Sequence, residues 1–121
     1  MARREGEMFR IREILNELKD DRAGATVMFI GSVRGGGQLK ALHYEMYDEM
    51  ATKCINHLKT EAVKKFKLTG AAVFHQKGRL RVGEMVVIVA CTAPHRRDAF
   101  KACQWLTSEM KKTVPIWKKK V

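Results

Sequence analysis

The last thirty residues of the chain carry one helical pattern that strongly limits the fold. Apolar side chains recur there at the spacing of a single helix face, at Ala99, Ala102, Cys103, Leu106 and Met110. Polar residues and lysines occupy the positions between them, so the pattern predicts an amphipathic helix with one face in the core. Pro94 suits its first turn and Pro115 prevents its continuation, because proline has no backbone N–H.

Cationic side chains lie at both ends of this predicted helix. His95, Arg96 and Arg97 follow Pro94 at its start, where free backbone N–H groups and the positive end of the helix dipole favour an anion. Beyond the helix, Trp117 is a large apolar anchor that could hold the following lysines in place. The segment therefore predicts two cationic clusters joined by a rigid helix.

Size and composition predict a single domain, residues 1–121, because 121 residues with 45% hydrophobic content can form a core. No apolar run reaches the ~18 residues that cross a bilayer, and the N-terminus lacks the apolar core of a signal sequence. The three cysteines Cys54, Cys91 and Cys103 show no C-x-x-C spacing, so neither a disulfide framework nor a metal site is predicted. We expect a cytoplasmic protein without a resident cofactor.

The net charge of +11 is concentrated in the second half of the chain. Residues 1–60 hold ten lysines and arginines against nine acidic residues, whereas residues 61–121 hold fourteen against four. A local excess of this kind predicts an anionic partner. Nucleic acid, a phosphorylated small molecule and an acidic protein would all produce the same charge pattern.

Periodicity and turn signals predict elements in the order helix, two strands, helix, three strands, helix. Besides the last helix, the expected elements are helices near 11–18 and 50–66 and strands near 25–32, 39–47, 71–76, 79–82 and 85–91. The first strand is a continuous apolar run and is expected to be buried on both faces. Short connections imply antiparallel neighbours, so the predicted fold class is α+β with a mostly antiparallel sheet.

Several single residues allow both a functional and an ordinary structural interpretation. Arg34, beside three glycines at a strand end, could bind a phosphate or cap a loop. Lys111 could share an anion pocket with Lys118 or belong to a solvated helix end. His75, inside an apolar strand, is expected to be a hydrogen-bonded structural histidine. Cys103 lies on the apolar stripe and is expected to be a core residue.

Five motifs then follow one another in register from about Gly24 to the end of the chain. They are Phe29-Ile-Gly-Ser-Val-Arg34, Leu42-His-Tyr-Glu-Met-Tyr47, His75-Gln-Lys-Gly-Arg-Leu-Arg-Val-Gly-Glu84, Ala93-Pro-His-Arg96, and Lys111 to Lys118 with its Pro-Ile-Trp-Lys ending. Together they resemble the large, catalytic subunit of molybdopterin synthase. The chain departs from the family pattern at Gln76, where arginine is usual, and at His43, where an acidic residue is common.

The resemblance implies an α/β hammerhead-like fold with three main helices and a sulfurtransferase of molybdenum cofactor biosynthesis. The substrate would be cyclic pyranopterin monophosphate (precursor Z), which becomes the dithiolene molybdopterin. The sulfur would come from a small ubiquitin-like subunit, whose thiocarboxylated C-terminal glycine enters a pocket of the large subunit. The resemblance also implies a homodimer of large subunits within a heterotetramer, with neither a membrane nor nucleic acid as a partner.

The same resemblance assigns roles to residues of this chain. Lys111 and Lys118 would be the catalytic pair. The substrate-binding residues would be Ser32, Val33, Arg34, His95, Arg96, Lys111, Lys118, Lys119 and Lys120. A lysine beside other cations can act as an acid, a base or an amine nucleophile, and the sequence does not choose among these roles for Lys111.

Two other function classes are compatible with parts of the sequence. A basic nucleic-acid-binding module would explain the charge, but no pattern of exposed aromatic residues interleaved with the lysines is expected, and Trp105 and Trp117 are the only tryptophans. A persulfide sulfurtransferase would need a reactive cysteine, and no cysteine lies in a glycine-rich or cationic loop. Both alternatives therefore have less support than the family resemblance.

Overall fold

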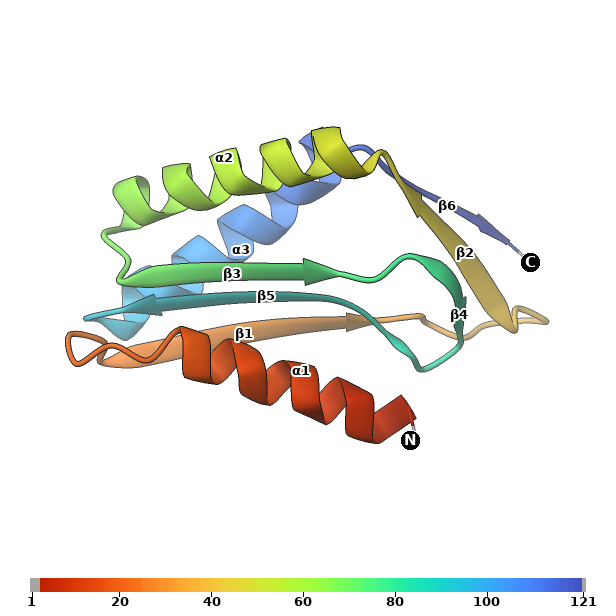
Figure 1. Ribbon diagram of the computed structural model, residues 1–121, viewed down its shortest axis with the longest axis horizontal. Coiled ribbons are helices and arrows are strands. Elements are labelled where there is room, and N and C mark those ends of the chain that lie inside the picture. Colours follow the sequence, from red (N-terminus) through yellow and green to blue (C-terminus); the bar gives the residue numbers. More distant parts are fainter. Residues whose placement is uncertain (1–2, 121) are drawn as a thin grey trace.

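A computed structural model describes residues 3–120, with side chains from residue 5, as three helices and two antiparallel sheets (Figure 1). The elements in chain order are α1 (Arg3–Glu17), β1 (Ala25–Ser32), β2 (Ala41–Met46), α2 (Asp48–Phe66), β3 (Gly70–His75), β4 (Gly78–Arg81), β5 (Met85–Ala93), α3 (Arg96–Thr113) and β6 (Ile116–Lys120). The predicted α+β class is confirmed.

The larger sheet has the order β1-β5-β3, and the smaller sheet has the order β4-β2-β6. In the larger sheet β1 pairs with β5 from Ala25 opposite Ala93 to Ser32 opposite Met85, with an irregularity at Gly31/Ser32. The smaller sheet lies at one end of the larger one and runs across it (Figure 1). Consecutive strands always lie in different sheets, so every connection, including those through α2 and α3, passes from one sheet to the other.

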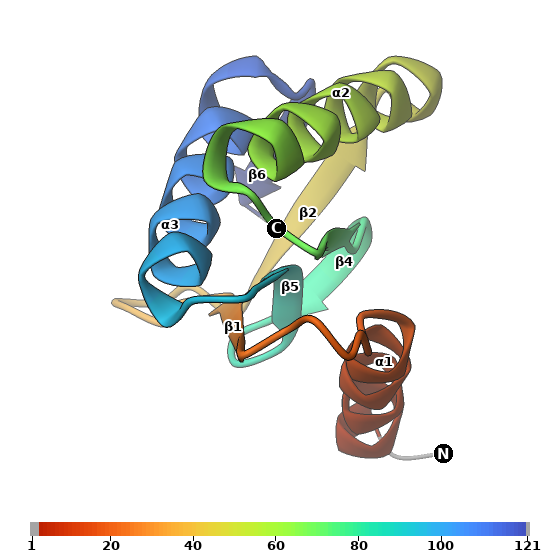
Figure 2. The same cartoon turned by 90° about the vertical axis from the view of Figure 1, so that its left-hand side faces the viewer.

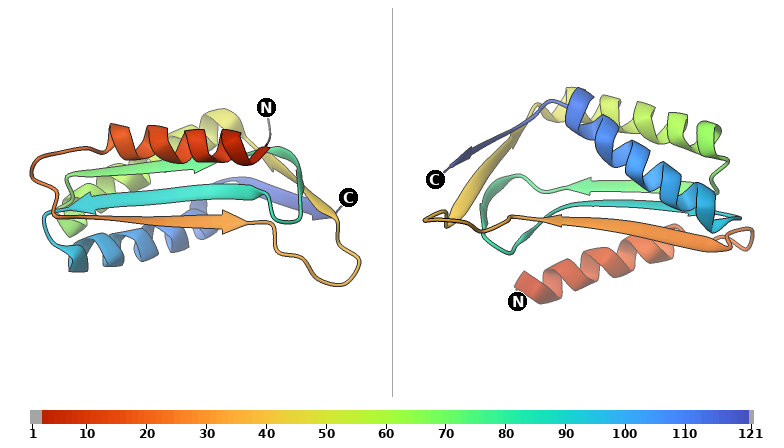
Figure 3. Two further views of the ribbon diagram at one scale, coloured as in Figure 1. Left: turned by 90° about the horizontal axis from the view of Figure 1, so that it is seen from below. Right: turned by 180° about the vertical axis from the view of Figure 1, so that it is seen from behind.

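Helices cover both faces of the larger sheet. α2 and α3 pack on one face and α1 on the other (Figures 2 and 3). Side chains alternate along a strand, so the two faces of β5 serve two cores. Val89 and Cys91 belong to the core under α2 and α3, whereas Ile88 and Ala90 belong to the core under α1. The central strand is therefore buried on both sides.

The predicted apolar stripe of the last helix is confirmed. Its five members are all buried, namely Ala99, Ala102, Cys103, Leu106 and Met110. The helix ends at Thr113, and the chain then turns at Pro115 into β6. Its start was placed wrongly, because Pro94 lies before the helix and His95 is the N-cap residue in an extended conformation.

The first strand is not the doubly buried strand that its apolar run predicted. β1 is an edge strand, and Phe29 and Ile30 are 39% and 43% exposed. A continuous apolar run can occur in a central strand and also in an edge strand whose apolar side chains are exposed. Composition alone therefore did not distinguish the two positions. The doubly buried strand is β5.

The pairing of the short strands also differs from the prediction. β3 and β4 are consecutive in the chain but lie in different sheets, and β4 pairs with β2. The last strand, β6, was not predicted, and it pairs with β2 through residues that were expected to form a tail held by Trp117. Trp117 itself is 54% exposed. Pairing with β2, rather than burial of the indole, therefore orders the terminal lysines.

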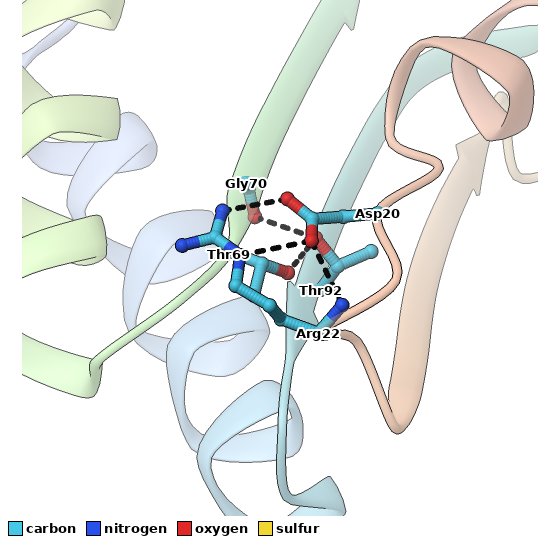
Figure 4. Close-up of polar contacts among 5 residues, drawn as sticks. All are labelled: Asp20, Arg22, Thr69, Gly70 and Thr92. Atoms are coloured by element: carbon cyan, nitrogen blue, oxygen red, sulfur yellow. Dashed lines mark hydrogen bonds and ion pairs between the residues drawn. The ribbon is translucent and has the colours of Figure 1, made fainter.

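Polar contacts hold the end of the larger sheet that lies beside the loop from α1 to β1 (Figure 4). Thr69 donates a hydrogen bond of 2.9 Å to the hydroxyl of the buried Thr92, which donates to the carbonyl of Gly70. In the loop, the Asp20 carboxylate accepts hydrogen bonds from the guanidinium and the backbone N–H of Arg22. The side-chain bond to Arg22 lowers the pKa of Asp20 to about 2.

The loop rejoins the sheet at Gly24, where β1 starts beside Pro94 and steric tolerance is small. A Cβ atom at Gly24 would lie 2.2 Å from the carbonyl oxygen of Pro94, which is backbone and has no rotamer to change. We expect Gly24→Ala to lower the free energy of unfolding by about 2 kcal/mol or more, because one strand end must move. Urea denaturation measures the change.

Gly36→Ala is the matched control, because a Cβ atom there meets no atom within 4 Å. Its effect on the free energy of unfolding should stay within about 0.5 kcal/mol. Equal losses in the two variants would contradict the steric argument.

Candidate active site

A cavity of about 770 Å³ lies where the two sheets meet the end of α3. This volume is typical of small-ligand sites. The charged side chains of its described lining are all cationic: Arg34, Lys111, Lys118 and Lys120. Apolar side chains from both sheets, among them Leu42 and Val86, form much of the remaining wall. The cavity therefore suits a small ligand that has both negative charge and apolar surface.

The alternation of β6 directs two of its lysines into this cavity. Lys118 pairs with Tyr44 and Lys120 with Leu42 across the sheet, and all four residues line the cavity. Lys119 lies between them in sequence and therefore on the opposite face. There its ammonium lies 3.6 Å from the Glu45 carboxylate. The run of three lysines thus contributes two cations to the cavity.

Lys111 comes from the last turn of α3. The neighbouring Met110 and the later Val114 are both buried in the core. This packing fixes the end of the helix at the cavity wall. One turn earlier, Thr107 lines the same wall, and its hydroxyl donates to the carbonyl of Cys103. Lys112 instead faces Glu109 at 3.4 Å. Among the described residues, Lys111 has no ion pair, so its charge remains available to a ligand.

Ser32 and Arg34 reach the cavity from the end of β1 and the loop after it. Val33 between them is only 3% exposed and packs with Leu80 and Val86. Its backbone N–H donates to the carbonyl of Glu84 at 2.9 Å, and its own carbonyl accepts from Gly83. Val33 therefore anchors this segment in the core, while its neighbours face the ligand site.

His95 and Arg96 lie at the other end of α3. The helix has 18 residues, so its two ends are separated by ~27 Å. Both side chains are exposed and neither lines the cavity. Of the predicted site residues, the structure brings together Ser32, Arg34, Lys111, Lys118 and Lys120. It leaves Val33, His95, Arg96 and Lys119 outside the cavity of the same chain.

His75 and Tyr44 are two titratable cavity residues that were not assigned to the site from the sequence. His75 ends β3 and Tyr44 lies in the middle of β2, and their rings meet edge to face at 5.6 Å between centroids. Burial lowers the pKa of His75 and raises the pKa of Tyr44. His75 was expected to be structural, and its Nδ1 does bond to the backbone carbonyl of Gln76. Its position beside β2 depends on sheet pairing that no sequence motif showed.

None of the three cysteines lines the cavity, and Cys54 is half-buried on α2. Cys91 and Cys103 are buried in the core between β5 and α3. Their mutual hydrogen bond and burial raise the pKa of Cys91, and Cys103 Sγ also donates to the Val89 carbonyl at 3.5 Å. The persulfide interpretation therefore has no support from the cysteine positions. Within residues 3–120 no group of three potential ligands could hold a metal ion, and no described helix is long and apolar enough to cross a membrane.

Solved structures with this architecture identify the class of protein. The crystal structure of molybdopterin synthase from Staphylococcus aureus matches with a TM-score of 0.81 and 34% sequence identity, covering 85% of this chain and 77% of that chain. The MoaE protein of Burkholderia ambifaria has a TM-score of 0.81 at 31% identity, covering 89% and 76%. The fold is that of molybdopterin synthase, an enzyme of molybdenum cofactor biosynthesis.

Sequence comparison identifies the family within this class. The molybdopterin synthase catalytic subunit of Pyrococcus abyssi is 41% identical over 95% of this chain and 80% of its own length. The Bacillus subtilis catalytic subunit is 35% identical over 89% and 71%. The family model described as MoaE protein matches residues 5–113. The chain therefore belongs to the MoaE family of molybdopterin synthase catalytic subunits, and the predicted resemblance is confirmed.

A more distant structure shares the fold alone. It is a protein–protein complex of subunits 1 and 2 of molybdopterin-converting factor from Helicobacter pylori, with a TM-score of 0.77 at 19% identity. The match covers 99% of this chain and 78% of that chain.

Two lysines of α3 differ in their position relative to the cavity. Lys111 lines it, whereas Lys101 is exposed elsewhere on α3. We expect Lys111→Ala to reduce molybdopterin formation by about a hundredfold or more, roughly 2.7 kcal/mol of transition-state stabilisation, because the variant would lose one cation of the predicted catalytic pair. Lys101→Ala should change the rate little. Single-turnover assays with matched thermal melts make the comparison.

Lys111→Arg provides the finer control. A guanidinium keeps the positive charge but does not readily release a proton or act as an amine nucleophile. Failure of this variant to restore activity favours proton transfer or covalent chemistry over charge alone. Indistinguishable rates for Lys111→Ala and Lys101→Ala would exclude Lys111 from the reaction.

Proposed function

We propose that this chain is the sulfur-transferring subunit that converts cyclic pyranopterin monophosphate into molybdopterin. The sulfur donor is the thiocarboxylated C-terminal glycine of a small ubiquitin-like subunit. The observation that carries this proposal is the cavity with four cations and no carboxylate among its described lining residues. The family membership supplies the reaction, and the cavity supplies a site for two anionic reactants.

The chemistry of both reactants fits these cations. A cyclic phosphate is bound well by the planar, bidentate guanidinium of Arg34. The thiocarboxylate is also anionic, and its acyl carbon develops a negatively charged oxygen when it is attacked. Lys111 and Lys118 would stabilise that oxyanion and move protons. Apolar surface from Leu42 and Val86 would contact the ring system of the substrate.

The small subunit is the expected macromolecular partner. The fold of this chain is shared by the Helicobacter pylori complex of subunits 1 and 2, which supports an assembly of two kinds of subunit. A flexible C-terminal tail could enter the cavity and bring its thiocarboxylate to the lysines. In this proposal residues 1–121 act as one catalytic domain.

The positions of His95 and Arg96 support a second copy of the chain in the assembly. These cations lie ~23 Å from Lys111 along one helix, so one small substrate does not reach both clusters in a single chain. In a homodimer with twofold symmetry, the start of one α3 could meet the cavity of the other chain, and each chain would complete its partner's site. The full assembly would then be a heterotetramer.

Reconstitution tests the proposed reaction directly. The purified chain is incubated with cyclic pyranopterin monophosphate and thiocarboxylated small subunit, and molybdopterin is measured. We expect product only when all three components are present. Absence of product, together with tight binding of random duplex DNA at physiological salt, would instead support the nucleic-acid-binding module.

Mixing two inactive variants tests whether sites are shared between chains. Arg96→Ala and Lys111→Ala are each expected to be inactive as homodimers. Random mixing gives heterodimers in half of the population, each with one intact site, so about a quarter of wild-type turnover should return. If Arg96 instead acts within its own chain, the mixture will stay inactive. Native mass spectrometry before and after mixing measures subunit exchange, because the two variant chains differ in mass.

A further inference from the structure

His75 is a titratable cavity residue that has no part in the proposed binding and catalytic roles. It lies at the end of β3, is half-buried, and lines the cavity with the four cations. Its Nδ1 lies 2.6 Å from the carbonyl oxygen of Gln76. A carbonyl only accepts, so Nδ1 carries the proton and Nε2 keeps its lone pair in the neutral ring. No hydrogen bond to Nε2 occurs among the described residues, so this lone pair is available to a ligand or water.

The surroundings of His75 keep the imidazole neutral. Burial lowers its pKa below the ordinary value near 6.5. The cations that share the cavity oppose a further positive charge on the ring. The phenol of Tyr44 at its edge also stays neutral, because burial raises its pKa. The charged and titratable groups that face His75 across the cavity are Arg34, Tyr44, Lys111, Lys118 and Lys120.

The proposed reaction needs a proton acceptor in this cavity. When a thiocarboxylate gives its sulfur to another molecule, the sulfur is for a time bound both to the acyl carbon and to the substrate. Water must then replace the sulfur on the acyl carbon, and attacking water must lose a proton. The described lining contains no carboxylate, so His75 is its one side chain that is neutral and basic near pH 7 by ordinary chemistry.

We propose that His75 is the general base that activates this water through Nε2. The water gives one proton to Nε2, and its oxygen bonds to the acyl carbon. The bond from that carbon to sulfur then breaks, and its electron pair stays on the sulfur, which remains attached to the substrate. The donor tail leaves as a carboxylic acid, which loses the second proton of the water to solvent and becomes a carboxylate. The imidazolium returns the first proton to the thiolate or to solvent.

This inference rests on the proposed function, and single-turnover experiments separate the two. With the wild-type chain, molybdopterin should form without accumulation of the acyl–sulfur adduct between small subunit and substrate. His75→Gln should lower the rate by about a hundredfold or more. The adduct should accumulate and be seen by intact mass spectrometry after acid quench. The Michaelis constant for the substrate should change less than the rate constant, because the missing group acts on water.

Two further measurements identify proton transfer as the lost property. The wild-type rate should fall as the pH falls through the lowered pKa of His75, below about 6.5, because the protonated ring cannot accept a proton from water. His75→Gln should lack this acidic limb. His75→Ala should regain activity when imidazole is added, with a pH dependence that follows the added base.

His57→Gln is the matched control, because His57 lies on the exposed side of α2 beside Glu61. It should behave as wild type. His75→Phe keeps an aromatic ring against Tyr44, so a thermal melt near wild type excludes unfolding as the cause of its low rate. Wild-type failure to form molybdopterin would overturn the proposed function. Normal turnover in His75→Gln, slow turnover without adduct, or weakened substrate binding alone would overturn the role of His75.

Discussion

The burial of β5 between two layers of helices is the interaction on which the remaining structure depends. Val89 and Cys91 face α2 and α3, while Ile88 and Ala90 face α1, and all four are fully buried. Burial of apolar area is the dominant favourable term in folding, and β5 contributes such area on both of its faces. The strand also joins the two cationic regions, since it begins at the cavity and ends just before the cations at the start of α3.

The two ends of α3 show how packing places charge. The buried stripe from Ala99 to Met110 fixes the rotation of the helix, which leaves Lys111 at the cavity wall and Lys101 in solvent. In β6 the alternation of side chains along the strand places Lys118 and Lys120 at the cavity and Lys119 on the opposite face. Neighbouring lysines with the same chemistry thus reach different surroundings through secondary structure alone.

Local patterns predicted the helices and most of the strands, because amphipathic spacing and turn residues act over a few positions. The buried stripe of α3 is an example. Pairing between distant strands was not predictable in this way. The edge position of β1 and the existence of β6 depend on partners far away in sequence. The cavity cations were predicted as a group through the family resemblance. His75 and Tyr44 were not placed beside them, because their positions depend on this long-range pairing.

The all-positive cavity has a consequence for the end of the proposed reaction. A thiocarboxylate and the carboxylate that replaces it carry the same charge, so the cations of the cavity attract the spent donor nearly as well as the fresh one. Electrostatics alone therefore provides no drive toward exchange of the two forms. Release must depend on the contacts that the whole small subunit makes outside the cavity, and on competition from newly charged donors. Rising ionic strength would weaken the hold on the used tail and on the incoming tail alike.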